Sequence, residues 1–151
     1  MIVLDTNVLS EPMKTNGDPA VAVWLDCQVR ENLYLTAINL AELRLGIELM
    51  PLGMRRSSLE ARLGAVIQSF GDARMLSFDA PAARQFAILV ARARLAGHAI
   101  AVADGQIAAI AATRGFAVAT RDTAPFVAAG IPVINPWTTP ASTGLQSPGK
   151  P

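Results

Sequence analysis

The chain opens with Met1-Ile2-Val3-Leu4-Asp5-Thr6-Asn7-Val8-Leu9, and this stretch decides the fold. Its apolar residues Ile2, Val3 and Leu4 predict a short buried strand, which ends abruptly on the carboxylate of Asp5. Ligands of open α/β folds bind outside the carboxyl ends of parallel strands, so Asp5 is well placed to hold a metal ion. An Asp in this position is also a common helix cap. The stretch alone leaves both interpretations open.

Strand and helix signals alternate along the rest of the chain. This alternation favours an α/β fold with a mostly parallel sheet that is covered by helices on both faces. We expect strands at residues 2–5, 33–35, 74–78, 116–120 and 133–134. We expect helices at residues 19–29, 36–50, 53–70, 79–97, 102–114 and 123–129. From residue 138 onward Pro, Ser, Thr and Gly dominate, so residues 138–151 are predicted to form a flexible tail after one domain, residues 1–137.

Composition narrows the class of protein. The 151 residues are 52% hydrophobic and 17% charged, which indicates one globular domain rather than a disordered chain. A net charge of +1 gives no overall nucleic-acid signature, although eleven of the thirteen basic residues are Arg. No apolar run is long enough to cross a bilayer, and no basic region precedes an apolar start. The single cysteine, Cys27, suits a reducing cytosol, so we expect a cytoplasmic protein.

Three further acidic residues occupy unusual local contexts. Glu42 shares a helix face with Ile38 and Leu45, so it either lies within an apolar stripe or pairs with an Arg at its edge. Asp104 lies near the start of a predicted helix, where the helix dipole favours a carboxylate for purely structural reasons. Asp122 follows a predicted strand as Asp5 does, and a helix-capping role is the alternative there.

Considered together, the four carboxylates point to a metal site. In a doubly wound sheet all four can project to the same edge, and carboxylates crowded together repel unless cations neutralise them. A set of oxygen ligands suits Mg²⁺ or Mn²⁺. The only histidine, His98, and the only cysteine, Cys27, do not supply a zinc site.

Five short motifs resemble one known family. They are VLDTNVLSE at residues 3–11, LAELRLG at 40–46, DGQIAA at 104–109, ATRD at 119–122 and NPW at 135–137. In this order and spacing they resemble PIN-domain ribonucleases, of the VapC toxin class of type II toxin–antitoxin systems and most closely its FitB-like branch. The resemblance implies an α/β/α sandwich around a five-stranded, mostly parallel sheet.

The resemblance also implies a set of functional residues. Asp5, Glu42, Asp104 and Asp122 would form the catalytic quartet of acids around one or two Mg²⁺ or Mn²⁺ ions. Supporting hydrogen-bonding positions would be Thr6, Asn7 and Thr120. Many relatives carry an acid just before the phenylalanine that corresponds to Phe126, and Pro125 stands there in this chain, so the fourth carboxylate is assigned to Asp122.

The expected activity is hydrolysis of RNA. We assign Asp5 and Asp104 as the principal metal ligands, with Asp122 at a second site or acting through water. Glu42 would orient or deprotonate the attacking water, and the family resemblance implies products with a 5′-phosphate and a 3′-hydroxyl. Candidate RNA-binding residues are Arg44 and Arg121, although Arg44 is equally placed to meet a protein partner.

The resemblance further implies a homodimer that is inhibited by a VapB- or FitA-like antitoxin, which is itself a DNA-binding protein, with no membrane partner. Three alternatives remain open. The chain could be a non-catalytic PIN module of a DNA-bound toxin–antitoxin repressor complex, or a DNA nuclease. A phosphotransfer receiver domain would need a lysine after a late strand, and the only lysines are Lys14 and Lys150.

Overall fold

The computed structural model describes residues 1–139, and a five-stranded sheet lies at their centre. The strands lie in the order β3-β2-β1-β4-β5, and every pairing between neighbours is parallel. Their bounds are β1 Ile2–Leu4, β2 Leu33–Thr36, β3 Met75–Leu76, β4 Ala117–Ala119 and β5 Val133–Ile134. The first strand therefore lies in the middle of the sheet, which places whatever follows Leu4 at the centre of one edge.

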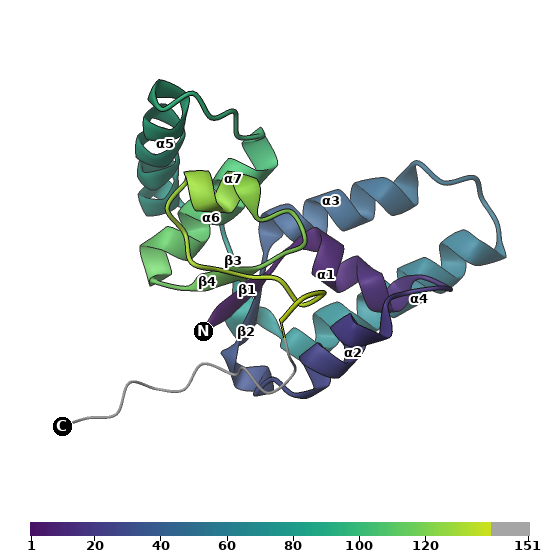
Figure 1. Cartoon of the computed structure of the whole chain (residues 1–151). Helices are drawn as coiled ribbons and strands as arrows, with labels where there is room; N and C mark the ends of the chain where they lie inside the picture. Colours follow the sequence, from purple (N-terminus) through teal and green to yellow (C-terminus); the bar gives the residue numbers. More distant parts are fainter. Residues whose placement is uncertain (140–151) are drawn as a thin grey trace.

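Helices cover both faces, which gives the three layers of an α/β/α sandwich (Figure 1). One face carries α5, α6 and α7, and the other carries α2 and α4. The helix bounds are α1 Thr6–Ser10, α2 Pro19–Asp26, α3 Ala37–Glu48, α4 Met54–Phe70, α5 Ala80–Leu95, α6 Val102–Arg114 and α7 Ala124–Ala128. The predicted α/β/α architecture is confirmed, and the sheet is wholly rather than mostly parallel.

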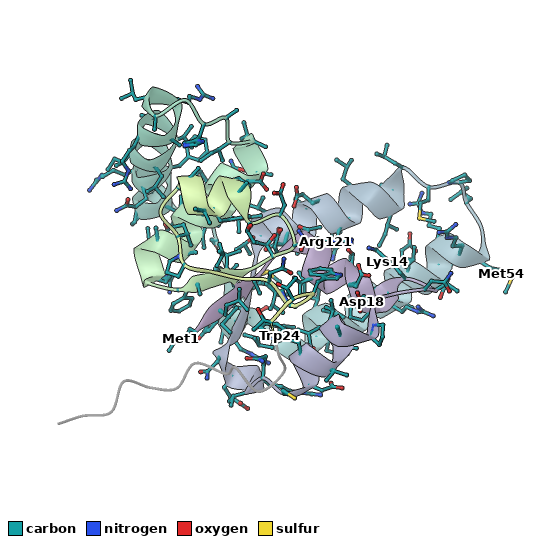
Figure 2. The ribbon with its side chains drawn as sticks, viewed as in Figure 1. Met1, Lys14, Asp18, Trp24, Met54 and Arg121 are labelled. Atoms are coloured by element: carbon teal, nitrogen blue, oxygen red, sulfur yellow. The ribbon has the colours of Figure 1, made fainter. Side chains whose placement is uncertain are left out.

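Alternation along the strands divides the apolar side chains between two cores. Val3 of β1 packs with α5, α6 and α7, whereas its neighbours Ile2 and Leu4 pack on the opposite side. This division follows from strand geometry, because successive side chains point to opposite faces. Trp24 of α2, labelled in Figure 2, is wholly buried in the second core.

Helix starts follow the caps that the sequence provides. Asp18 accepts a hydrogen bond from the backbone N–H of Ala20 at 2.9 Å and begins α2, with Pro19 at its first position. Asp79 begins α5 in the same way, by accepting from Ala82 N–H at 3.0 Å.

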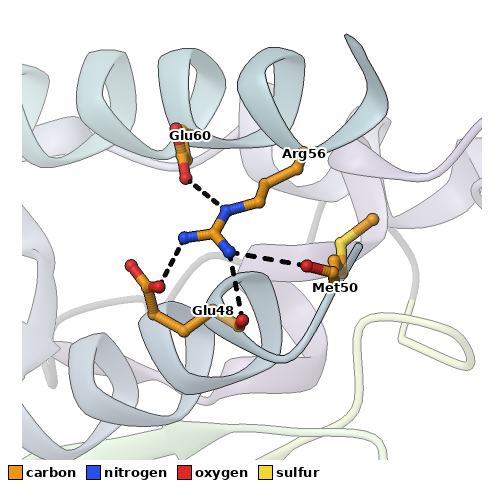
Figure 3. A network of polar contacts seen from close by, with 4 residues as sticks. All are labelled: Glu48, Met50, Arg56 and Glu60. Carbon is orange, nitrogen blue, oxygen red and sulfur yellow. Dashed lines mark hydrogen bonds and ion pairs between the residues drawn. The ribbon is translucent and has the colours of Figure 1, made fainter. Parts of the chain in front are cut away.

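Helices α3 and α4, with the loop between them, form an arm that extends beyond the sheet (Figure 1). Arg56 ties the two helices together: it forms ion pairs with Glu48 and Glu60 and donates to the backbone carbonyls of Glu48 and Met50 (Figure 3). Large apolar side chains nevertheless face solvent here, and Leu52 and Met54 are 88% and 91% exposed. The arm is therefore held by polar contacts at a place where it displays apolar surface.

Two short elements differ from the predictions. The strand expected at residues 74–78 is only the two residues of β3, and helix α1 was not expected. Both are short elements, for which periodicity gives almost no signal. The predicted tail lies outside the described residues, apart from Thr138 and Thr139, whose N–H groups donate to the carbonyl of Asn135. Within residues 1–139, no helix combines the length and apolar character that crossing a membrane requires.

Candidate active site

Asp5 is the buried centre of the site. It follows β1 directly, only 5% of it is exposed, and its Oδ1 accepts a hydrogen bond from Thr6 N–H at 2.7 Å, so it also caps α1. Its Oδ2 accepts from the Thr120 hydroxyl at 2.7 Å and from Asn7 Nδ2 at 2.6 Å. The capping interpretation of this residue is confirmed, and its second carboxylate oxygen is held by side-chain donors. The metal-binding interpretation stays a prediction.

The loop after β4 supplies the second part of this network. Thr120 is wholly buried at the end of β4, and its hydroxyl oxygen accepts from Asn7 Nδ2 at 3.0 Å and from Asp122 N–H at 3.1 Å. Asn7 Oδ1 in turn accepts from Arg121 N–H at 3.1 Å. Residues 120–122 are therefore fastened to the start of α1, beside Asp5.

Asp122 does not cap the helix that follows it. The residue before α7 is Thr123, and no side chain forms a capping hydrogen bond there. The capping alternative for Asp122 is thus excluded, and its side chain is exposed at the carboxyl edge of the sheet.

Glu42 joins the site through Thr6. The Thr6 hydroxyl donates to Glu42 Oε2 at 2.5 Å and accepts from Asn39 Nδ2 at 3.0 Å. Glu42 is exposed on α3 and forms no ion pair within residues 1–139, so the alternative of a pairing with an Arg is not seen. The expected apolar stripe is only partly packed, because Ile38 contacts a core whereas Leu45 is 59% exposed.

Asn39 and Thr36 are functional-site neighbours that the sequence reasoning missed. Both are wholly buried at the start of α3, where they form a reciprocal capping box. A Thr followed three residues later by Asn is a recognisable helix-start pattern, but it does not reveal that the Asn amide also reaches Thr6, 33 positions away in the sequence.

Electrostatics show that the four acids share one edge. Partial burial raises the pKa of Asp104 to about 6, and the negative charges of Asp5, Asp122 and Glu42 add to this rise. The pKa of Asp5 is also raised, mainly by burial and further by the charge of Glu42, although the hydrogen bonds from Thr120, Thr6 N–H and Asn7 oppose the rise. A raised carboxyl pKa means that the surroundings of the group disfavour its ionised form, here through burial and neighbouring negative charge.

Packing explains how Asp104 reaches this edge. It lies in the first turn of α6, next to Gly105. A Cβ atom on Gly105 would lie 2.8 Å from a ring carbon of Phe86 and 3.0 Å from a methyl of Val90, so only glycine lets α6 approach α5 this closely. The element that approaches Gly105 closely is thus α5.

A hard divalent cation fits the chemistry of these donors. They comprise four carboxylates with threonine hydroxyls and an asparagine amide, and oxygen ligands of this kind suit Mg²⁺ or Mn²⁺. None of the four carboxylates forms an ion pair with any residue in the described range. As their side chains stand, no three acidic, histidine or cysteine groups among residues 1–139 lie close enough to form a compact metal cluster.

The two candidate RNA-binding arginines lie in different places. Arg121 is exposed beside the site, with its guanidinium carbon 5.2 Å from the ring centre of Trp137. Arg44 instead lines a separate hollow with Glu48 and Glu60 between α3 and α4. Residues two apart on a helix point to different sides, so Arg44 is not brought together with Glu42 and the other carboxylates.

A groove of about 520 Å³ begins beside Glu42 and runs between α1, α3 and α4. Its basic lining residues are Lys14, Arg55 and Arg62, of which Lys14 pairs with Glu11 and Arg62 donates to the Met13 carbonyl at 3.2 Å. Arg55 and Arg62 lie on the face of α4 that borders this groove. Helical spacing alone could not show that this face is opposed by another element.

Comparison with known proteins agrees with the geometry. The family model described as PIN domain matches residues 2–131. The VapC ribonuclease Y4jK of Sinorhizobium fredii is 52% identical over 137 residues, which span 91% of this chain and 98% of that protein. Toxin FitB of Neisseria gonorrhoeae is 45% identical over 137 residues, which span 91% of this chain and 99% of that protein.

A solved structure shares the fold as well. The structure of FitAB bound to an IR36 DNA fragment aligns with a TM-score of 0.87 at 43% identity, covering 92% of this chain and 97% of that chain. High identity and nearly complete coverage on both sides make the family assignment direct. The chain therefore belongs to the PIN-domain family and, within it, to the group of VapC and FitB toxins.

Proposed function

We propose that this chain is a metal-dependent endoribonuclease that acts in the cytoplasm as the toxin of a toxin–antitoxin pair. The observation that supports this most is the gathering of acids at the carboxyl edge of the sheet, where Thr120 and Asn7 hold Asp5 and Thr6 holds Glu42. Their charges, together with burial, raise the pKa of Asp104. Such a site gains most from a divalent cation, because the cation relieves the repulsion among its acids. The relative named a VapC ribonuclease supports RNA as the substrate.

Each acid has a proposed role. Asp5 and Asp104 hold Mg²⁺ or Mn²⁺, and Asp122 contributes to a second or water-mediated position. When bound, such an ion activates water and neutralises charge on the phosphate. Glu42 orients the attacking water and takes its proton, while Thr6, Asn7 and Thr120 hold the carboxylates in place. Hydrolysis then leaves a 5′-phosphate and a 3′-hydroxyl.

The groove beside Glu42 is the proposed path of the RNA strand. Arg55 and Arg62 line it, and neither forms an ion pair among the described residues. Arg121 would contact the strand on the other side of the acids. Arginine suits this task, because its planar guanidinium group can donate two hydrogen bonds to phosphate oxygens at the same time.

The proposed partner is a VapB- or FitA-like antitoxin that forms a DNA-binding complex with a dimer of this chain. The similar FitAB complex is bound to a DNA fragment in its solved structure, which supports this assignment. The exposed apolar residues Leu45, Leu49, Leu52 and Met54 support a protein partner for the arm, since such surface is costly in a monomer. The same DNA-bound relative favours a second candidate function, a non-catalytic module of a repressor complex.

Cleavage by the purified chain separates the two functions. We expect magnesium-dependent cutting of RNA that EDTA abolishes, and a loss of at least about a hundredfold in rate for Asp5→Asn. Asp72→Asn, which alters an exposed acid just beyond the end of α4, is the matched control and should retain full activity. Cleavage by Asp5→Asn at the wild-type rate would refute the assignment, and inactivity of the wild type with every divalent ion would favour the non-catalytic module.

The groove makes a separate prediction about RNA binding. Arg55→Ala and Arg62→Ala should each raise KM for RNA severalfold and reduce the salt dependence of binding by about one phosphate contact. Arg84→Ala, on the exposed surface of α5, serves as the control and should leave both quantities unchanged. Equal effects from all three variants would show that net charge, rather than this groove, governs binding.

A further inference from the structure

A chain of hydrogen bonds connects the buried start of α3 to Glu42. We propose that Asn39 is a positioning residue, which directs the hydroxyl hydrogen of Thr6 onto Glu42 and so fixes the carboxylate that handles the attacking water. This inference rests on the proposed function for the meaning of its kinetic effect. The hydrogen-bond chain itself stands on the geometry of three residues.

The orientation of the Asn39 amide is determined by its other partner. Its Oδ1 lies 3.1 Å from Thr36 N, and a backbone N–H can only donate, so the atom facing it must be the amide oxygen. The Thr36 hydroxyl donates to the same oxygen at 2.6 Å. The amide nitrogen is therefore the atom that faces Thr6, at 3.0 Å from its Oγ1.

This orientation sets the direction of the next bond. Asn39 Nδ2 can only donate, so Thr6 Oγ1 accepts from it and keeps its own hydrogen for another partner. That partner is Glu42 Oε2, at 2.5 Å, because an ionised carboxylate can only accept. The order of donation thus runs in one direction, from Asn39 to Thr6 to Glu42.

Glu42 depends on this contact for its position. Its side chain is exposed and has three rotatable bonds, and among residues 1–139 Thr6 is its one hydrogen-bond partner. Asn39, by contrast, is wholly buried and held by three hydrogen bonds to Thr36, which makes it a rigid anchor. The hydrogen bonds from Asn39 to Thr6 and from Thr6 to Glu42 transmit the rigidity of the α3 cap to the Glu42 carboxylate, which would otherwise sample several rotamers.

Asn39→Asp tests the direction of donation. The introduced carboxylate still accepts from Thr36, which preserves the helix cap, but it can only accept from Thr6. The Thr6 hydroxyl hydrogen then turns away from Glu42. We expect kcat to fall about tenfold while KM for RNA changes less than about twofold, since Glu42 handles the water rather than the RNA.

A double-mutant cycle with Thr6→Val separates positioning from other effects. Once the hydroxyl is gone, Asn39→Asp should lower kcat no further, whereas its effect on the unfolding midpoint should persist in both backgrounds. An equal loss of kcat in both backgrounds would overturn the proposal, because it would show that general destabilisation or the added negative charge acts without Thr6. Wild-type kcat in Asn39→Asp would overturn it as well.

Further variants keep the test decisive if Asn39→Asp does not fold. Thr6→Ser retains the hydroxyl, so its kcat should stay near the wild-type value. Thr6→Val lacks the hydroxyl, so its kcat should fall. Thr113→Val is the matched control, because the Thr113 hydroxyl donates only to the Ile110 carbonyl within α6, at 2.8 Å, and kcat should not change. Equal kcat values for Thr6→Ser and Thr6→Val would refute the hydrogen-bond chain.

A crystal structure of Thr6→Val distinguishes failure of this inference from failure of the proposed function. The Glu42 carboxylate should leave its position in Thr6→Val and keep it in Thr6→Ser, whether or not the chain cleaves RNA. An unmoved Glu42 would refute the positioning role on its own. Absence of RNA cleavage by the wild type would refute only the proposed function.

Discussion

The chemistry of the site rests on how individual side chains are held. Asp5 is both a helix cap and the acceptor of two side-chain hydrogen bonds, from Thr120 and Asn7. Such preorganisation fixes a buried carboxylate without neutralising it, since every partner is an uncharged donor. Asp104 is the opposite case, because its surroundings supply negative charge and partial burial. Hydrogen bonds offset part of the unfavourable ionisation of Asp5, whereas none among the described residues does so for Asp104, so ionisation of Asp104 destabilises the folded state more.

Asp104 makes the metal-free protein less stable as pH rises. Its pKa in the folded state, about 6, exceeds the value of 3.8 expected without its neighbours, so the folded state binds a proton more readily than the unfolded state. Raising the pH from 5 to 8 through this pKa should lower the free energy of unfolding, and solvent screening of this partly exposed group limits the loss to about 1 kcal/mol. The raised pKa of Asp5 acts in the same direction.

Urea unfolding in EDTA at pH 5 and pH 8 measures this effect. Asp104→Asn should reduce the difference between the two midpoints, and Asp72→Asn should leave it as in the wild type. Glu11 does not interfere between pH 5 and pH 8. Its pKa is lowered from 4.5, mainly by the hydrogen bond from Lys14, so its contribution to stability is lost only at more acidic pH. A wild-type midpoint that is higher at pH 8 than at pH 5 would contradict the assigned electrostatics.

At the scale of elements, the active edge depends on how closely helices approach. The contact between α5 and α6 passes over Gly105, where a Cβ atom would meet Phe86 at 2.8 Å, whereas Gly64 in α4 has no neighbour within 4 Å of that position. These two glycines both lie inside helices, yet their surroundings differ. They form a matched pair for testing whether close packing holds the start of α6 in place.

Gly105→Ala should destabilise the fold by about 1–2 kcal/mol, because overpacking against Phe86 and Val90 outweighs the gain in helix propensity. Gly64→Ala should stabilise it by up to about 1 kcal/mol, since only the propensity term applies. Thermal unfolding of both variants checks the pair. Stabilisation of similar size in both would show that α5 yields easily and that Gly105 is not required for the approach.

The whole molecule shows what the sequence can and cannot predict. Strand and helix alternation predicted the layers and the order of the longer elements, because these are long enough or well enough capped to leave a pattern, whereas α1 and β3 are too short to do so. Asp5, Asp104 and Asp122 were singled out by their positions at strand ends and a helix start, and Glu42 by the apolar residues on its helix face; their catalytic role stays a prediction. Asn39 was not found, because its link to Thr6 spans 33 positions and no local pattern records it. The placement of Arg44 needed the direction of α3 and its packing against α4.

We propose that Asp5 and Asp104 hold a divalent cation at the carboxyl edge of the sheet, with Asp122 and Glu42 beside them. Calorimetric titration of the metal-free protein with Mn²⁺ tests it most directly, comparing the wild type with Asp5→Asn, Asp104→Asn and the control Asp72→Asn. We expect saturable binding by the wild type and the control, and a loss of affinity of at least about tenfold in the other two variants. Unchanged Mn²⁺ affinity in Asp5→Asn and Asp104→Asn, or no binding by the wild type, would contradict it.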